Sequence, residues 1–160
     1  MFFVGSEFPE ASYVRKTFTL RKMDFPPEVA MTKRSLLRWF ALSFGLISEK
    51  ESRSTILDIL DGFFYFQVSK KYAPTTQELL VHLQEQQKKV DEKLLRYHLK
   101  RLIDVGLVER RKGKLSFASD PKADPNDIIS GFNHNIALPM QDTLKDLGEA
   151  MQKIKDNYNI

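Results

Sequence analysis

Three apolar helical segments followed at once by a short hairpin, all within residues 54–119, are the feature that most restricts the fold of this chain. The first segment, Ser54–Ser69, repeats large apolar side chains around most of a helical circumference, which is typical of a buried helix. Pro74 interrupts the pattern, and Thr75 with Glu78 then gives the Thr-x-x-Glu sequence of a capping box at the start of a shorter helix. The pattern therefore predicts two helices separated by a proline break.

A third helix and a hairpin come next in the chain. Asp91 is a residue that caps helices, and the apolar positions after it recur at helical spacing: Leu94, Leu95, Leu99, Leu102 and Ile103. Gly106 ends the pattern, because glycine tolerates the left-handed conformation that closes many helices. Two extended segments, Leu107–Arg110 and Lys114–Ala118, then flank a turn that contains Gly113. Helices and a hairpin in this order are typical of a winged helix-turn-helix, so we expect a mostly α (α+β) fold with a two-stranded wing.

The same region resembles a group of known regulators. Val90–Arg110, and most closely the stretch YHLKRLIDVGLVERR that begins at Tyr97, is similar to the recognition helix and first wing strand of ArsR-like and MarR-like prokaryotic and archaeal regulators. The resemblance spans residues 54–119 and implies a DNA-binding domain. It places core, turn and first-strand roles on Leu95, Leu99, Leu102, Gly106, Leu107 and Val108. Metal-sensing ArsR members use cysteines, and this chain has none, so metal sensing is not implied.

A recognition helix directs long polar side chains outward, because only its outer face enters the roughly 12 Å wide major groove. Arg96 is the candidate for reading a guanine edge, since its planar guanidinium matches two acceptors there, and Tyr97 lies beside it. Lys93, Lys100 and Arg101 are candidates for phosphate contacts. Two alternatives stay open: a merely solvated basic face, and a winged-helix protein-interaction subunit of a larger complex without direct base readout.

Basic charge is concentrated in this part of the chain. The formal net charge is +4, yet residues 88–114 alone hold ten basic and four acidic residues. Such a localised excess suggests a polyanionic partner, here double-stranded DNA. The hairpin contributes Arg110, Arg111, Lys112 and Lys114, which we expect along the minor groove or its flanking phosphates, although solubility alone would explain some of these charges.

The carboxy-terminal residues predict an amphipathic helix that starts at Pro139 and runs from Met140 to about Asn157. Its apolar positions alternate at spacings of four and three residues and include the candidate dimerisation residues Leu144, Leu147, Met151 and Ile154. A stripe this narrow packs either on the chain's own core or on a second copy. We expect a homodimer, because paired winged helices read two half-sites and a helix beyond the wing is suited to join them.

The first 50 residues fall outside the winged pattern. Tyr13–Met23 is rich in β-forming residues and predicts a strand, which Pro26 and Pro27 would end. Thr32–Ile47 predicts a helix capped by Thr32. Its basic side chains either add phosphate contacts or are merely exposed: Lys33, Arg34 and Arg38.

A length of 160 residues suits one domain with extra helices. We expect an N-terminal extension at residues 1–50, a winged helix-turn-helix DNA-binding domain at 51–119, and a linker with a C-terminal dimerisation helix at 120–160. The linker begins with the Pro- and Asp-rich stretch 120–126.

The sequence lacks residues and motifs that several classes of protein require. Without cysteine, disulfides, thiolate metal sites and cysteine nucleophiles are excluded. The histidines show no metal-ligand spacing, and phosphate loops and hydrolase motifs are missing, so we expect no enzyme, no metal and no cofactor. The longest nearly apolar stretch, Trp39–Ile47, is too short to span a membrane, and the amino end does not resemble a signal peptide. We therefore expect a cytoplasmic protein without membrane association.

A small-molecule effector is left open by the sequence. A pocket among aromatic side chains competes with the interpretation that they form ordinary core, which is the more common role at helical spacing. The side chains in question are Trp39, Phe40, Phe63, Phe64 and Phe66. Asp58 and Asp61 lie at helical surface spacing, and we expect them to be solvated.

Overall fold

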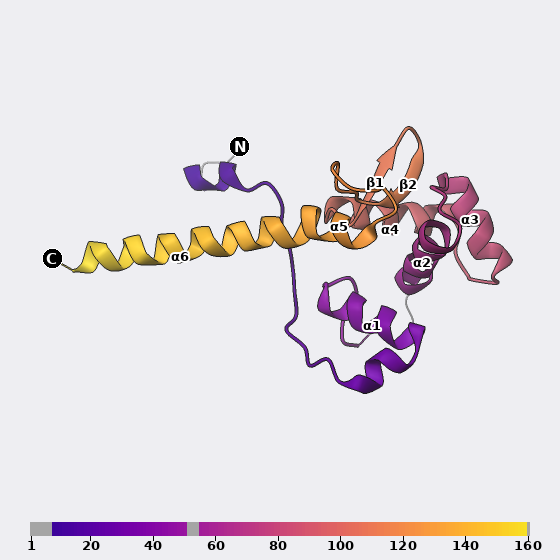
Figure 1. Cartoon of the computed structure of the whole chain (residues 1–160), viewed down its shortest axis with the longest axis horizontal. Coiled ribbons are helices and arrows are strands. Elements are labelled where there is room, and N and C mark those ends of the chain that lie inside the picture. The colour runs from indigo at the N-terminus through magenta and orange to yellow at the C-terminus, as the bar shows by residue number, and fades with distance from the viewer. Residues whose placement is uncertain (1–7, 51–54, 160) are drawn as a thin grey trace, which may run out of the picture.

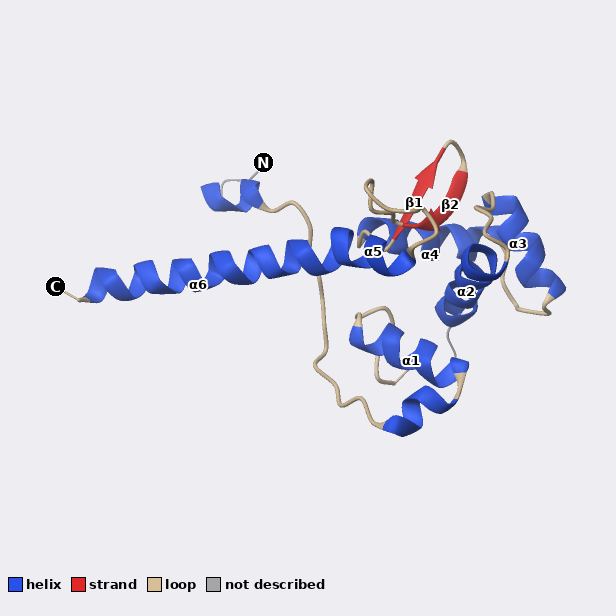
Figure 2. Ribbon diagram, viewed as in Figure 1, coloured by secondary structure: helices blue, strands red, loops and turns tan. Residues whose placement is uncertain are grey.

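The computed structural model describes residues 8–50 and 55–159, which are mostly helical and contain one two-stranded antiparallel sheet (Figure 1, Figure 2). The expected mostly α, α+β composition is thereby confirmed. The elements are α1 (Lys33–Ser43), α2 (Thr55–Phe64), α3 (Thr76–Glu85), α4 (Glu92–Asp104), β1 (Val108–Arg111), β2 (Lys114–Phe117), α5 (Ile128–Phe132) and α6 (Leu138–Tyr158). Short 3-10 segments η2 (Pro9–Tyr13) and η3 (Pro27–Met31) precede α1, and π-helical segments η4 (Tyr65–Ser69) and η5 (Asn133–Ala137) follow α2 and α5. Within these residues no helix has the length and apolarity needed to cross a membrane.

Helices α2, α3 and α4 share one apolar core, because each presents leucine, isoleucine or phenylalanine at helical spacing. The largest fully buried side chains come from these three helices, both strands and η5: Ile56, Ile59, Leu60, Phe63, Leu79, Leu83, Leu95, Leu99, Leu102, Val108, Leu115 and Ile136. Each such side chain stabilises the fold by about 1.5–3 kcal/mol relative to an exposed position. These helices and the hairpin form the body of the molecule.

The predicted helix ends are confirmed by their hydrogen bonds. In the capping box before α3, the Glu78 amide donates to Thr75 Oγ1 at 3.1 Å, and the Thr75 amide donates to Glu78 Oε1 at 2.9 Å. Asp91 Oδ1 accepts from the Leu94 amide at 2.8 Å at the start of α4. Beyond α4, Gly106 has a φ of +82°, a backbone conformation that residues with a Cβ rarely adopt.

The hairpin places its side chains on two distinct faces. Strand β1 pairs with β2 so that Val108 faces Phe117 and Arg110 faces Leu115, and these pairs lie on the side that meets the helices. Between the strands, Lys112 and Gly113 both have positive φ, the conformation of a tight two-residue turn that matches the twist of a hairpin.

The N-terminal residues pack differently from the prediction. Helix α1 begins after Thr32, as predicted, and Thr32 Oγ1 accepts from the Ser35 amide at 3.0 Å. The helix ends at Ser43, four residues before the predicted end at Ile47, and Gly45 follows with a positive φ of 72°. The Leu37 side chain of α1 lies in the common core. The strand predicted at Tyr13–Met23 is wrong, because beyond η2 these residues form an irregular extended segment. Its main-chain partner is a helix end rather than another strand: the Arg21 amide donates to the Ser43 carbonyl at 2.8 Å.

The C-terminal helix starts earlier than predicted. Asp127 caps α5 through the Ser130 amide at 3.1 Å, and the helical path continues through η5 into α6. Pro139 therefore lies inside this path, just after the π-helical turn, and does not begin it. Residues 120–126, the expected linker, contain turns and no regular element. Helix α6 then projects away from the body (Figure 1).

Candidate nucleic-acid interface

Helix α4 separates its side chains into a buried and an exposed face. Leu95, Leu99 and Leu102 are at most 1% exposed and anchor the helix in the core. The opposite face is solvent-exposed and carries the predicted DNA-binding residues Lys93, Arg96, Tyr97 and Lys100. Spacings of three and four residues hold these four side chains on one surface, because an α-helix turns once every 3.6 residues.

Two exposed ion pairs arrange the basic groups of this surface. Arg96 Nε lies 3.0 Å from Glu92 Oε2, and Lys100 Nζ lies 2.9 Å from Asp104 Oδ2. Exposed pairs one helical turn apart contribute little net stability. A phosphate or a base edge can therefore replace either carboxylate at small cost.

Arg110 brings the hairpin next to this face of α4. It lies on the helix-facing side of β1, and its Nη2 donates to Thr76 Oγ1 at 3.3 Å. Arg96, Lys100 and Arg110 line the same hollow of about 280 Å³ between α4 and the hairpin. The structure thus brings three of the predicted residues, Arg96, Lys100 and Arg110, around one hollow that Asp104 also lines.

The other basic residues of the hairpin point outward. Arg111 Nε lies 2.8 Å from Glu109 Oε2, and Lys114 Nζ lies 5.2 Å from the centre of the Tyr72 ring. Lys112 occupies the tip of the turn. All three side chains are exposed, so they are free to approach a polyanion beside α4.

Arg101 has a different position from the other candidates on α4. Its Nη2 donates to the Leu46 carbonyl at 2.8 Å, and its guanidinium lies 5.8 Å from the centre of the Tyr97 ring. The side chain is partly buried and connects α4 to the segment that follows α1. This geometry favours a positioning role over the predicted phosphate contact.

The sequence interpretation did not predict the ion pairs between α1 and α2. Lys33 Nζ lies 3.0 Å from Asp61 Oδ1, and Arg34 Nη1 lies 2.9 Å from Asp58 Oδ1. Asp58 and Asp61 were expected to be solvated, and both are partly buried and paired instead. Lys33 and Arg34 remain exposed, which is one of the two outcomes that the sequence left open.

The predicted dimerisation residues lie on α6 as an exposed apolar stripe. Helix α6 contains no buried residue. The exposed fractions along the stripe are 66% for Leu144, 60% for Leu147, 73% for Met151 and 59% for Ile154. Large apolar side chains in a row are normally covered, so this stripe is a candidate contact surface.

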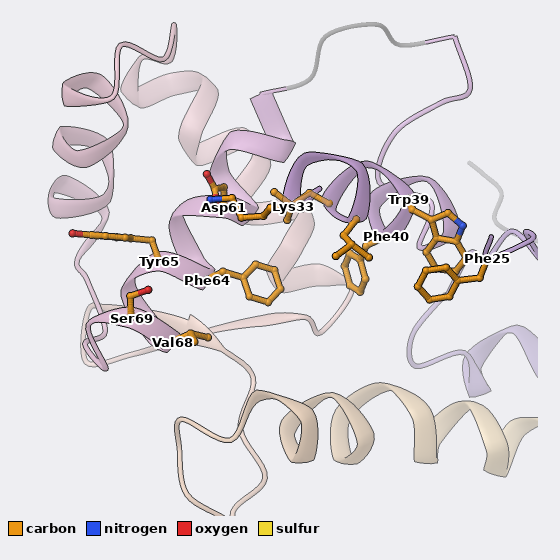
Figure 3. Close-up of a pocket in the computed structure, with 11 residues that line it drawn as sticks. Phe25, Lys33, Trp39, Phe40, Asp61, Phe64, Tyr65, Val68 and Ser69 are labelled. Carbon is orange, nitrogen blue, oxygen red and sulfur yellow. The ribbon is translucent and has the colours of Figure 1, made fainter. Parts of the chain in front are cut away.

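The aromatic residues considered for an effector pocket separate into two environments. Phe63 is buried in the core, and Phe66 packs against His82 with ring centres 5.1 Å apart. Trp39, Phe40 and Phe64 instead line a cavity of about 530 Å³ between α1 and α2 (Figure 3).

Among the described residues, no group of three His, Asp or Glu side chains is arranged so that it could hold a metal ion.

The pKa of Glu78 is lowered, first by the hydrogen bond from the Thr75 amide and then by that from the Tyr72 hydroxyl at 2.8 Å. His134 Nδ1 lies 3.9 Å from Asp120 Oδ1. These interactions stabilise helix ends and turns.

Comparison of the chain with family models, curated proteins and solved structures finds no match.

Proposed function

We propose that α2, α3, α4 and the β1–β2 hairpin form a winged helix-turn-helix that binds double-stranded DNA, and that the chain acts as a homodimeric transcriptional regulator. The observation that carries this proposal is the division of α4. One face is fixed in the core by fully buried leucines, and the other exposes basic and aromatic side chains beside a basic hairpin.

The outer face of α4 has the chemistry of a major-groove helix. Arg96 is the base-reading residue in this proposal, because its fork of donors matches the two acceptors of a guanine edge. Lys93 and Lys100 flank it at helical spacing and would contact phosphates. Tyr97, 59% exposed, adds an apolar surface with a hydroxyl at its end.

The hairpin supports the same orientation. Arg110 shares the hollow beside α4, whereas Arg111, Lys112 and Lys114 extend beyond it. With α4 in the major groove, these outer side chains would meet the next stretch of backbone or the minor groove, where negative potential attracts arginine and lysine.

Helix α6 supports dimer formation. Its 21 residues correspond to about 31 Å at 1.5 Å per residue. Along this length the apolar positions alternate at spacings of three and four residues, the heptad pattern with which two helices keep one seam in contact. Two copies paired along this seam would each hold one α4 away from the dimer axis.

A salt titration of affinity for a random-sequence duplex tests DNA binding. Phosphate contacts release counterions, so the wild-type affinity should fall steeply with salt, and Arg111→Ala should reduce the slope of log affinity against log salt by about 1. Lys153→Ala on α6, which also removes one exposed ion pair, is the matched control and should leave the slope unchanged. A flat wild-type response would favour the winged-helix protein-interaction subunit.

A further inference from the structure

An open cavity lies beside the contact between α1 and α2. It has a volume of about 530 Å³ and lies between α1, α2 and the π-helical segment η4. Figure 3 shows the Phe25 and Trp39 rings at one end and Tyr65 at the other, with Phe40 and Phe64 between them. The cavity volume lies within the usual range of small-molecule sites, about 300–1,000 Å³.

The cavity walls carry few polar side chains, and the two charged ones are paired with each other. Lys33 Nζ lies 3.0 Å from Asp61 Oδ1 in a solvent-accessible ion pair, so the lining has no net charge. Trp39 Nε1 donates to the Asp24 carbonyl at 2.7 Å, and the Trp39 ring stacks on Phe25 with centres 4.5 Å apart. Apart from the Ser69 and Tyr65 hydroxyls, the rest of the lining is aromatic and aliphatic. A charged ligand would lose hydration against this surface without gaining a partner of opposite net charge.

Two rings of this cavity also contact the parts of the molecule that the proposed function uses. Phe64 lies 4.7 Å from Phe117, the last residue of β2, measured between ring centres. Phe40 lies 6.4 Å from Phe132, in the helical path that leads to α6. A second cavity, of about 260 Å³, is lined by the same Phe40 and Phe64 together with β2 and α5 residues.

We propose that the cavity between α1 and α2 is a binding site for an uncharged aromatic small molecule. We further propose that its occupancy alters DNA binding, because Phe64 and Phe40 connect it to the wing and to the dimerisation helix. The regulatory part rests on the proposed function. The binding part does not, because it needs only the cavity.

Trp39 makes the binding part directly measurable, because it is the single tryptophan of the chain and lies in the cavity wall. The probe is 4-phenylbutanol, with 4-phenylbutanoate and 4-phenylbutylammonium as charged analogues of the same shape. Trp39 emission, excited where the probes and tyrosine do not absorb, should change saturably with one 4-phenylbutanol per chain. Both charged analogues should bind at least about tenfold more weakly, since a charge loses its hydration in an apolar site.

Filling the cavity provides the decisive variant. Val68→Phe places a ring on the cavity wall and should weaken 4-phenylbutanol binding about tenfold or more, whereas Val14→Phe, the same substitution on the exposed N-terminal segment, should not. Circular dichroism checks the fold of both variants, and Leu36→Phe fills the same cavity from α1 if Val68→Phe is unfolded. An unresponsive Trp39, or equal affinity in the folded filled variant, would overturn the site.

The regulatory part is tested with duplex DNA. Saturating 4-phenylbutanol should change the DNA affinity of the wild type and of Val14→Phe about fivefold or more, and leave that of Val68→Phe unchanged. If Trp39 reports binding while DNA affinity stays constant, the regulatory proposal is wrong. If the chain without probe does not bind DNA, the proposed function fails, and the Trp39 titration still decides the binding site.

Discussion

Helices α4 and α6 are both amphipathic, yet among the described residues 8–50 and 55–159 only α4 has its apolar face covered. The leucines of α4 are at most 1% exposed, whereas Leu147 of α6 is 60% exposed and the whole of α6 buries no residue. The pattern in the sequence specifies that an apolar face exists. Whether the face meets the chain's own core or another molecule depends on where the helix lies in the fold.

Truncating one leucine on each helix gives the largest expected difference. Leu99→Ala should lower the free energy of unfolding by about 2–5 kcal/mol, because it leaves a cavity in a packed core. Leu147→Ala should change it by no more than about 0.5 kcal/mol in dilute, monomeric protein. Denaturant titrations of both variants measure the two values, and equal losses would mean that α6 is covered by its own chain.

A charge on the α6 stripe tests whether a second copy covers it. Leu147→Asp would bury an unpaired carboxylate in an apolar contact, so the dimer should dissociate. Light scattering should give twice the chain mass of 18.6 kDa for wild type and the single mass for the variant. Gln152→Asp introduces the same residue on α6 away from the stripe and should remain dimeric. A dimeric Leu147→Asp would place the interface elsewhere.

Arg96→Ala tests whether the exposed face of α4 recognises bases or only phosphates. If Arg96 reads a guanine edge, its loss should weaken binding to a site selected from random duplexes by about 1–3 kcal/mol, and binding to random DNA far less. Affinity for the two duplexes at one salt concentration gives the comparison. Equal losses on both would make Arg96 a phosphate contact.

The smallest effect concerns the capping box that begins α3. Thr75→Ala should lower the free energy of unfolding by about 1 kcal/mol, because the Glu78 amide loses its acceptor. Denaturant titrations of wild type and variant measure the difference.

The lowered pKa of Glu78 makes the free energy of unfolding depend on pH. The unfolded chain, with the higher pKa, binds more protons as the pH falls through the acidic range, so this contribution is present above that range and is lost below it. Denaturant titrations from neutral to acidic pH should show a weaker dependence in Glu78→Gln.

Local signals account for what was predicted well. The caps at Thr32, Thr75 and Asp91, and the left-handed residue Gly106, act within a few positions along the chain, so the starts of α1, α3 and α4 were predictable. The predicted strand at Tyr13–Met23 failed because β-propensity needs a partner strand, and the partner here is the end of α1.

The helices of the body, the basic hairpin and the apolar stripe of α6 follow from local sequence patterns, because periodicity and capping depend on neighbouring residues. Three other features arise only when the helices pack: Arg101 donates to the Leu46 carbonyl, Asp58 and Asp61 pair with α1, and Trp39 lines an open cavity. Those outcomes depend on atoms that are distant along the chain and meet only when the helices pack, so no local pattern specifies them.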